Sequence, residues 1–102
     1  MNERLRFHRL VPDDLVVAVR WYAGISPNLA NRFRTEIDST FNRISENPLM
    51  YAEDDDGLRY ARVGIFPYLI QYRSEGSTTL IIGVYHASSD PGKWRDRIRE
   101  SR

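Results

Sequence analysis

The chain has 102 residues, 41% of them hydrophobic and 28% charged, which suits one globular domain with a single core. It has no cysteine and two histidines, so the sequence predicts no disulfide, no metal site and no cofactor. No apolar run approaches the roughly 20 residues of a membrane span, and the first ten residues lack an apolar signal segment, so we expect a cytoplasmic protein without membrane association.

Charge is unevenly distributed along the chain. Residues 1–58 hold seven basic and ten acidic side chains, whereas residues 59–102 hold eight basic and four acidic ones. A basic surface attracts nucleic acid or an acidic partner, but a solvated basic tail gives the same composition. Charge alone therefore leaves both interpretations open.

The first half of the sequence predicts a strand followed by two helices. Residues 4–8 alternate polar and apolar side chains, as a half-buried strand does. A first helix opens at Pro12 and stops at Gly24. A second helix begins at Ser26 and Pro27 and ends at Asn47, before Pro48. Their apolar stripes are Leu15, Ala18, Val19 and Tyr22 on the first helix, and Leu29, Phe33, Ile37, Phe41 and Ile44 on the second.

The second half predicts three strands and a short helix. Residues 48–58 form a loop whose acidic centre, residues 53–57, is typical of a solvated turn rather than a metal site. Strands are expected at 58–63, 67–73 and 78–86, with a hairpin turn at 75–77. The last strand is the most apolar and should be central, and Gly83 within it indicates a bulge or a close approach. Asp90 and Pro91 then open a terminal helix.

This order, βααβββ, predicts an α+β fold in one domain spanning residues 1–102. A helical hairpin should pack on one face of a small, mainly antiparallel sheet, followed by a short C-terminal helix. The other face should be partly open, with Arg, Tyr and His along it. On the first helix, Trp21 and Tyr22 should lie in the core and at its rim.

Two segments, "RYARVGIFPYLIQYR" and "IIGVYHASSDPGKWRDR", resemble the RelE/ParE superfamily of bacterial toxins, and within it the ParE-type, plasmid-stabilisation branch. The likeness covers nearly the whole chain. It implies the toxin of a type II toxin–antitoxin module, which inhibits DNA gyrase without hydrolysis and is neutralised by a cognate antitoxin that wraps around it. We expect the antitoxin segment to bind a long apolar groove between the helical hairpin and the sheet edge.

The RelE-type branch of the same superfamily resembles ribosome-dependent mRNA endonucleases, whose two cations would fall at positions 69 and 87. Here those residues are Leu69 and Ala87, which argues against that chemistry. Two alternatives remain: an endonuclease with a non-standard catalytic set, or a non-toxic family member that only binds an antitoxin. The catalytic candidates under the first alternative are His86, Arg62, Arg73 and Tyr72.

Six residues are predicted to bind the target or a partner: Arg59, Arg62, Arg73, Trp94, Arg95 and Arg97. Arginine suits bidentate contacts with phosphate or carboxylate, and tryptophan is frequent at interfaces. Trp94 either folds back onto the sheet or stays exposed for a partner. We expect Arg95 and Arg97 to be exposed, so that reversing their charges costs little stability.

Overall fold

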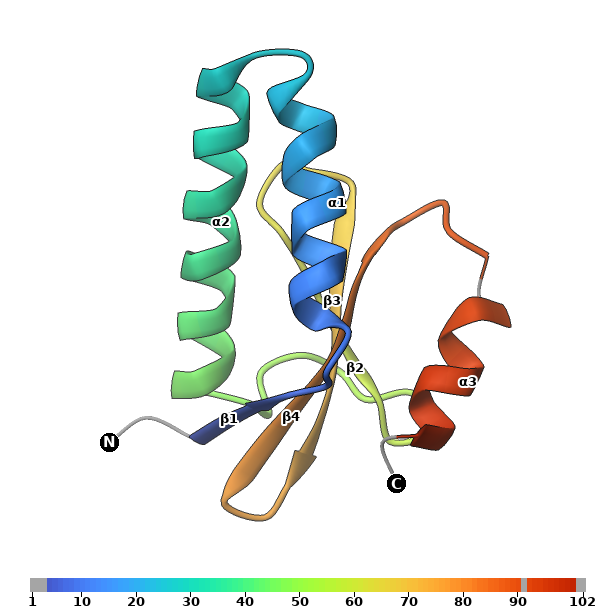
Figure 1. The fold of residues 1–102 in the computed structure, drawn as a ribbon. Coiled ribbons are helices and arrows are strands. Elements are labelled where there is room, and N and C mark those ends of the chain that lie inside the picture. Colours follow the sequence, from blue (N-terminus) through green and yellow to red (C-terminus); the bar gives the residue numbers. More distant parts are fainter. Residues whose placement is uncertain (1–3, 91, 101–102) are drawn as a thin grey trace.

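The computed structural model describes residues 4–90 and 92–100, which fold into three helices and a four-stranded mixed sheet (Figure 1). The elements are β1 (Arg4–Phe7), α1 (Val11–Ala23), α2 (Pro27–Glu46), β2 (Arg59–Arg62), β3 (Tyr68–Glu75), β4 (Thr78–His86) and α3 (Gly92–Glu100). The predicted α+β class and element order are confirmed. No helix in this part of the chain is long and apolar enough to cross a membrane.

The strands lie in the order β1-β4-β3-β2. The pairs β2–β3 and β3–β4 are antiparallel, whereas β1 runs parallel to β4 and pairs with residues Thr78 to Ile81. As predicted, the apolar strand β4 is an interior strand. Because β1 is short, the second half of β4 has no strand on its β1 side.

Local sequence signals set the ends of the two long helices. Pro12 lies in the first turn of α1, where the missing N–H costs nothing, and Gly24 caps its end. The Ser26 hydroxyl accepts a hydrogen bond from the Leu29 N–H at the start of α2. Asn47 ends α2, because the residue before a proline avoids the helical region.

The helical hairpin packs on one face of the sheet, here called the hairpin face, through a cluster of aromatic rings. The Tyr22 ring centroid lies 5.0 Å from those of Phe33 and Phe66, and Phe33 lies 5.1 Å from Tyr68. These rings join α1, α2 and β3 in one buried core. The expectation for Trp21 is wrong, because it lies one residue off the buried stripe and is 67% exposed.

The opposite side of the sheet, here called the second face, carries a smaller core. Leu58, Leu80 and Ile82 are buried there, with Tyr60 and Ile98 packed against them. Ile98 belongs to α3, which lies across the sheet from α2 in Figure 1. The second face is therefore covered in part by α3 rather than left open.

Gly83 marks both a bulge and a close approach. The register of β3 with β4 shifts between Gln71, which pairs with Gly83, and Tyr72, which pairs with Ile81. A Cβ atom on Gly83 would overlap the ring and hydroxyl of Tyr85. Glycine is thus needed here so that the Tyr85 ring can fold back over the strand.

The acidic loop closes as a turn. The Asp54 carboxylate accepts hydrogen bonds from the N–H groups of Asp56 and Leu58, each at 2.9 Å. Gly57 takes φ +80°, which glycine adopts without strain. These bonds close the turn, and Arg59 and Tyr60 of β2 hold the loop through Glu53 and Asp54.

Replacing Gly83 with alanine should lower the free energy of unfolding by about 1–3 kcal/mol, because the new methyl group overlaps the Tyr85 ring. The matched control is Gly24→Ala, where the nearest atom to the new Cβ is a carbonyl oxygen at an ordinary 3.4 Å, so the change should stay within about 0.5 kcal/mol. Urea titration of both variants measures the difference. In the Tyr85→Ala background, Gly83→Ala should cost less free energy of unfolding, because the overlapping ring is gone. An equal cost of Gly83→Ala with and without the Tyr85 ring would show that the overlap is not the cause.

Candidate partner-binding site

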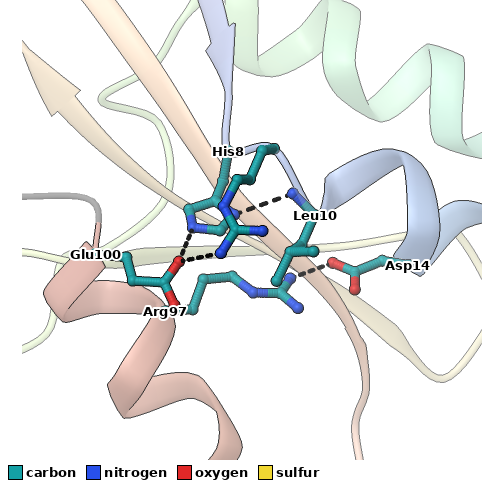
Figure 2. Close-up of polar contacts among 6 residues, drawn as sticks. His8, Leu10, Asp14, Arg97 and Glu100 are labelled. Atoms are coloured by element: carbon teal, nitrogen blue, oxygen red, sulfur yellow. Dashed lines mark hydrogen bonds and ion pairs between the residues drawn. The ribbon is translucent and has the colours of Figure 1, made fainter.

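An ion pair between Arg97 and Asp14 ties α3 to the start of α1 (Figure 2). Both side chains are largely buried, with 15% and 13% of their surfaces exposed. The same Asp14 oxygen accepts a hydrogen bond from the Val84 N–H at 3.0 Å. Because β1 does not extend as far as Val84, the Asp14 carboxylate accepts the hydrogen bond that a strand would otherwise accept. The same carboxylate neutralises the charge of Arg97 in α3.

A second polar link joins the end of α3 to the chain before α1. The Leu10 N–H donates to Nδ1 of the buried His8 at 3.1 Å, so Nδ1 is an acceptor and a neutral ring carries its proton on Nε2. His8 Nε2 then donates to the Glu100 carboxylate at 3.2 Å, and Arg9 reaches the same oxygen at 3.2 Å (Figure 2). The middle and the last residue of α3 are thus held by residues from the first fifteen positions.

Aromatic contacts hold the first turn of α3 to the second face. The Trp94 ring stacks on Tyr85 with centroids 4.2 Å apart and planes 15° apart, and Tyr60 lies 6.1 Å away. The Arg97 guanidinium lies 5.2 Å from the Tyr85 ring centre, a cation–π distance. Trp94 therefore folds back onto the sheet, the first of its two predicted positions.

Burial perturbs the ionisable groups at this junction. Burial raises the pKa of Tyr85 to about 12, although the positive charge of Arg97 opposes the shift. Burial also lowers the pKa of Arg97, but the hydrogen bond and negative charge of Asp14 outweigh it, so the net shift of the Arg97 pKa is upward. Arg97 thus keeps its positive charge beside Asp14 in the folded protein.

Three of the predicted binding arginines are engaged inside the protein. Arg59 donates to the Tyr51 carbonyl and pairs with Glu53 at 3.3 Å, and Arg73 pairs with Glu75 at 3.1 Å. Arg97 is the third, so the expectation that it is exposed is wrong, and reversing its charge would leave Asp14 buried beside a like charge. Arg62 and Arg95 are exposed.

The structure does not gather the four catalytic candidates at one place. His86 is exposed at the end of β4 opposite Tyr68, and its Nδ1 accepts from the Ser88 N–H at 3.1 Å. Tyr72 lies four residues further along β3, about 13 Å at about 3.3 Å per residue. Tyr72 is fully buried and donates its hydroxyl to the Pro48 carbonyl at 2.7 Å. Arg62 and Arg73 lie at opposite ends of the β2–β3 pairing, on the second face.

An apolar groove of about 420 Å³ lies between α1 and α2. Its apolar lining is Leu15, Val16, Val19 and Ile37, and its polar lining is Arg20, Arg34 and Asp38. This is not the groove predicted between the hairpin and the sheet edge. At that place a smaller pocket of about 290 Å³ lies between α1 and the end of β4, beside α3. The same helix α1 exposes 69% of Val17 and 67% of Trp21, so apolar surface continues beyond the groove.

The family described as "ParE toxin of type II toxin-antitoxin system, parDE" matches residues 5–91. The chain belongs to the ParE toxin family. "Toxin ParE2" of Mycobacterium tuberculosis, from strains H37Rv and CDC 1551, is 30% identical over 92 residues, which are 89% of this chain and 88% of that protein. The solved structure "Chromosomal ParDE TA system from P. aeruginosa" has the same fold, with a TM-score of 0.70 and 18% identity over 81% of this chain and 94% of that one.

Membership in the ParE family implies an antitoxin partner for this chain. The family match ends at residue 91, immediately before α3. The junction of α3 with His8, Arg9 and Asp14 therefore lies partly outside the matched region. Little in the sequence indicates this junction, because Asp14 looks like any acidic residue in the first turn of a helix, which the helix dipole favours.

Stability should fall as the pH rises from about 10 to about 12. Burial raises the pKa of both Tyr72 and Tyr85 from 10.0 to about 12, so the unfolded chain loses these protons first and is favoured in that window. Below pH 10 both tyrosines are protonated in the folded and unfolded chain, so their full contribution to the free energy of unfolding is present. Urea titrations from pH 8 to 11.5 measure the effect, with Tyr85→Phe expected to flatten the dependence. Tyr51, which is only partly buried, provides the control variant Tyr51→Phe, and an equal flattening there would contradict the assignment.

Proposed function

We propose that this ParE-family toxin inhibits DNA gyrase without hydrolysing nucleic acid, and that a cognate antitoxin neutralises it. The observation that carries the proposal is the family match over residues 5–91 in a chain with Leu69 and Ala87 where an endonuclease needs cations. Cleavage of RNA by its own 2′-hydroxyl needs a base, a cation for the phosphate and an acid for the leaving oxygen. The scattered positions of His86 and Tyr72 give no substitute for that arrangement.

The exposed basic residues of α3 suit the target contact. Arg95 is exposed, and 74% of the Arg99 side chain is exposed beside Asp96. Neither is needed for packing, whereas Trp94 and Arg97 on the same helix hold it to the protein. Arg95 and Arg99, together with Arg62 on the second face, give a positive surface that can bind an acidic region of the target.

The groove between α1 and α2 suits the antitoxin. Its apolar floor fits an amphipathic helix that inserts side chains at every third or fourth position. Arg20 and Arg34 line the groove and would pair with acidic residues flanking those anchors. Neutralisation by wrapping then needs contacts well beyond this groove, since interfaces of that kind exceed about 2,000 Å².

The purified protein should inhibit DNA supercoiling by gyrase and should leave ribosome-bound mRNA intact. Arg95→Glu should weaken inhibition with little change in the free energy of unfolding, because an exposed charge contributes at most about 0.5 kcal/mol. Arg32→Glu, on the exposed surface of α2, is the matched control and should inhibit as the native chain does. Discrete mRNA cleavage that disappears in His86→Ala would instead support the endonuclease alternative, and a protein that binds its antitoxin but does neither would support the non-toxic one.

Val16→Glu should weaken antitoxin binding by about tenfold or more, because it places a charge among the apolar residues of the groove. Val16 is 45% exposed, so the fold should tolerate the change. The control is Ile65→Glu in the β2–β3 loop, where the side chain is 73% exposed and outside the groove. Calorimetric titration with the protein encoded beside this gene gives both affinities, and equal losses in the two variants would place the antitoxin elsewhere.

A further inference from the structure

The outer face of α1 exposes apolar side chains that the core of the domain does not use. Val16, Val17 and Trp21 are 45%, 69% and 67% exposed. The buried residues of α1 lie on the other side of the helix and belong to the main core. Figure 1 shows α1 beside α2 and in front of the sheet, so the outer face points away from both. Three exposed apolar side chains within two turns of one helix form a patch that suits contact with another protein surface.

Two charged side chains lie on this face, one on each side of the apolar pair Val16 and Val17. Asp13 and Arg20 are seven residues apart, close to two full turns of helix, so they project in nearly the same direction. Both are exposed, and neither makes an ion pair or a side-chain hydrogen bond with residues 4–90 or 92–100. The face thus changes along the helix from acidic through apolar to basic.

This order of charges is complementary to itself when two copies of α1 run antiparallel. A two-fold axis between positions 16 and 17 places Asp13 of each copy opposite Arg20 of the other, because both lie three and a half residues from the axis. The valines of the two copies then meet at the centre, and the two ion pairs lie about 10 Å apart along the helices. A parallel pair of helices would instead bring like charges together, so the charges select the antiparallel direction.

We infer that the outer face of α1 is a homodimer interface, and that its partner is a second copy of this chain in the antiparallel orientation. The contact involves one 13-residue helix from each copy, about 20 Å long, and falls below the roughly 1,200 Å² of stable complexes. The dimer is therefore weak, with a dissociation constant on the order of 100 μM.

The dimer contact shares residues with the groove between α1 and α2. Val16 and Arg20 line that groove, and they also lie at the centre and at the edge of the dimer contact. A helix bound in the groove therefore excludes the second copy, and the free protein covers part of its own groove at high concentration. That the antitoxin is the competitor rests on the proposed function, whereas the dimer rests only on the residues of α1.

Charge reversal tests the antiparallel register in the full chain. Asp13→Arg and Arg20→Asp should each weaken self-association about tenfold or more, because each change turns both ion pairs into contacts between like charges. An equimolar mixture of the two variants should associate as the native chain does, since every contact in the mixed dimer joins opposite charges. Both side chains are exposed, so the urea midpoints of the variants should stay close to that of the native chain.

Sedimentation velocity from about 10 to about 1,000 μM spans the expected dissociation constant. The matched control is Arg32→Asp on the exposed surface of α2, which has the same net charge as Arg20→Asp. This control should dimerise as the native chain does and should fail to restore association to Asp13→Arg. A native chain that stays monomeric over this range would overturn the inference, as would single reversals that leave association unchanged or a mixture that stays monomeric. None of these measurements uses gyrase or the antitoxin, so their failure is distinct from failure of the proposed function.

Discussion

The ring cluster of Tyr22, Phe33, Phe66 and Tyr68 fixes the position of every surface on this molecule. It lies where α1, α2 and the start of β3 meet, and its members touch at centroid distances of 5.0 to 6.0 Å. Because these large side chains are buried on the hairpin face, the hairpin cannot slide along the sheet without losing them. The groove between the helices and the second face are therefore held on opposite sides of a rigid layer.

The two sides of that layer differ in chemistry. The hairpin side offers an apolar groove with arginines along it, open to a partner. The second face carries a small core, two tyrosines and a buried glutamine, and α3 covers part of it. When one partner chain binds both sides, binding at the first side raises the effective concentration of the rest of that chain at the second side. That arrangement allows tight binding without a single large interface.

Much of the fold follows from the sequence because its signals are local and agree with one another. Ser26 with Pro27 and Asn47 with Pro48 mark both ends of α2, and the residues between them repeat at helical spacing. The α3 junction was not predictable in this way, because Asp14 and Arg97 are far apart in the chain and each suits an exposed helix position. Arg97 is buried through its pairing with Asp14 and its packing against Tyr85, which no periodicity reveals. The candidate site depends on such long-range pairs, so its arrangement could be recognised only in the structure.

The parallel pairing of β1 with β4 has a consequence for synthesis of the protein. β1 leaves the ribosome before its partner strand, Thr78 to Ile81, and α1, α2, β2 and β3 are made between the two. Contacts between distant segments form late, since the intervening chain must be ordered first. The aromatic cluster also needs Phe66 and Tyr68, so neither face of the nascent domain has a complete core before β3 and β4 have been made. A ribosome making this chain therefore carries no folded toxin domain until β4 has emerged.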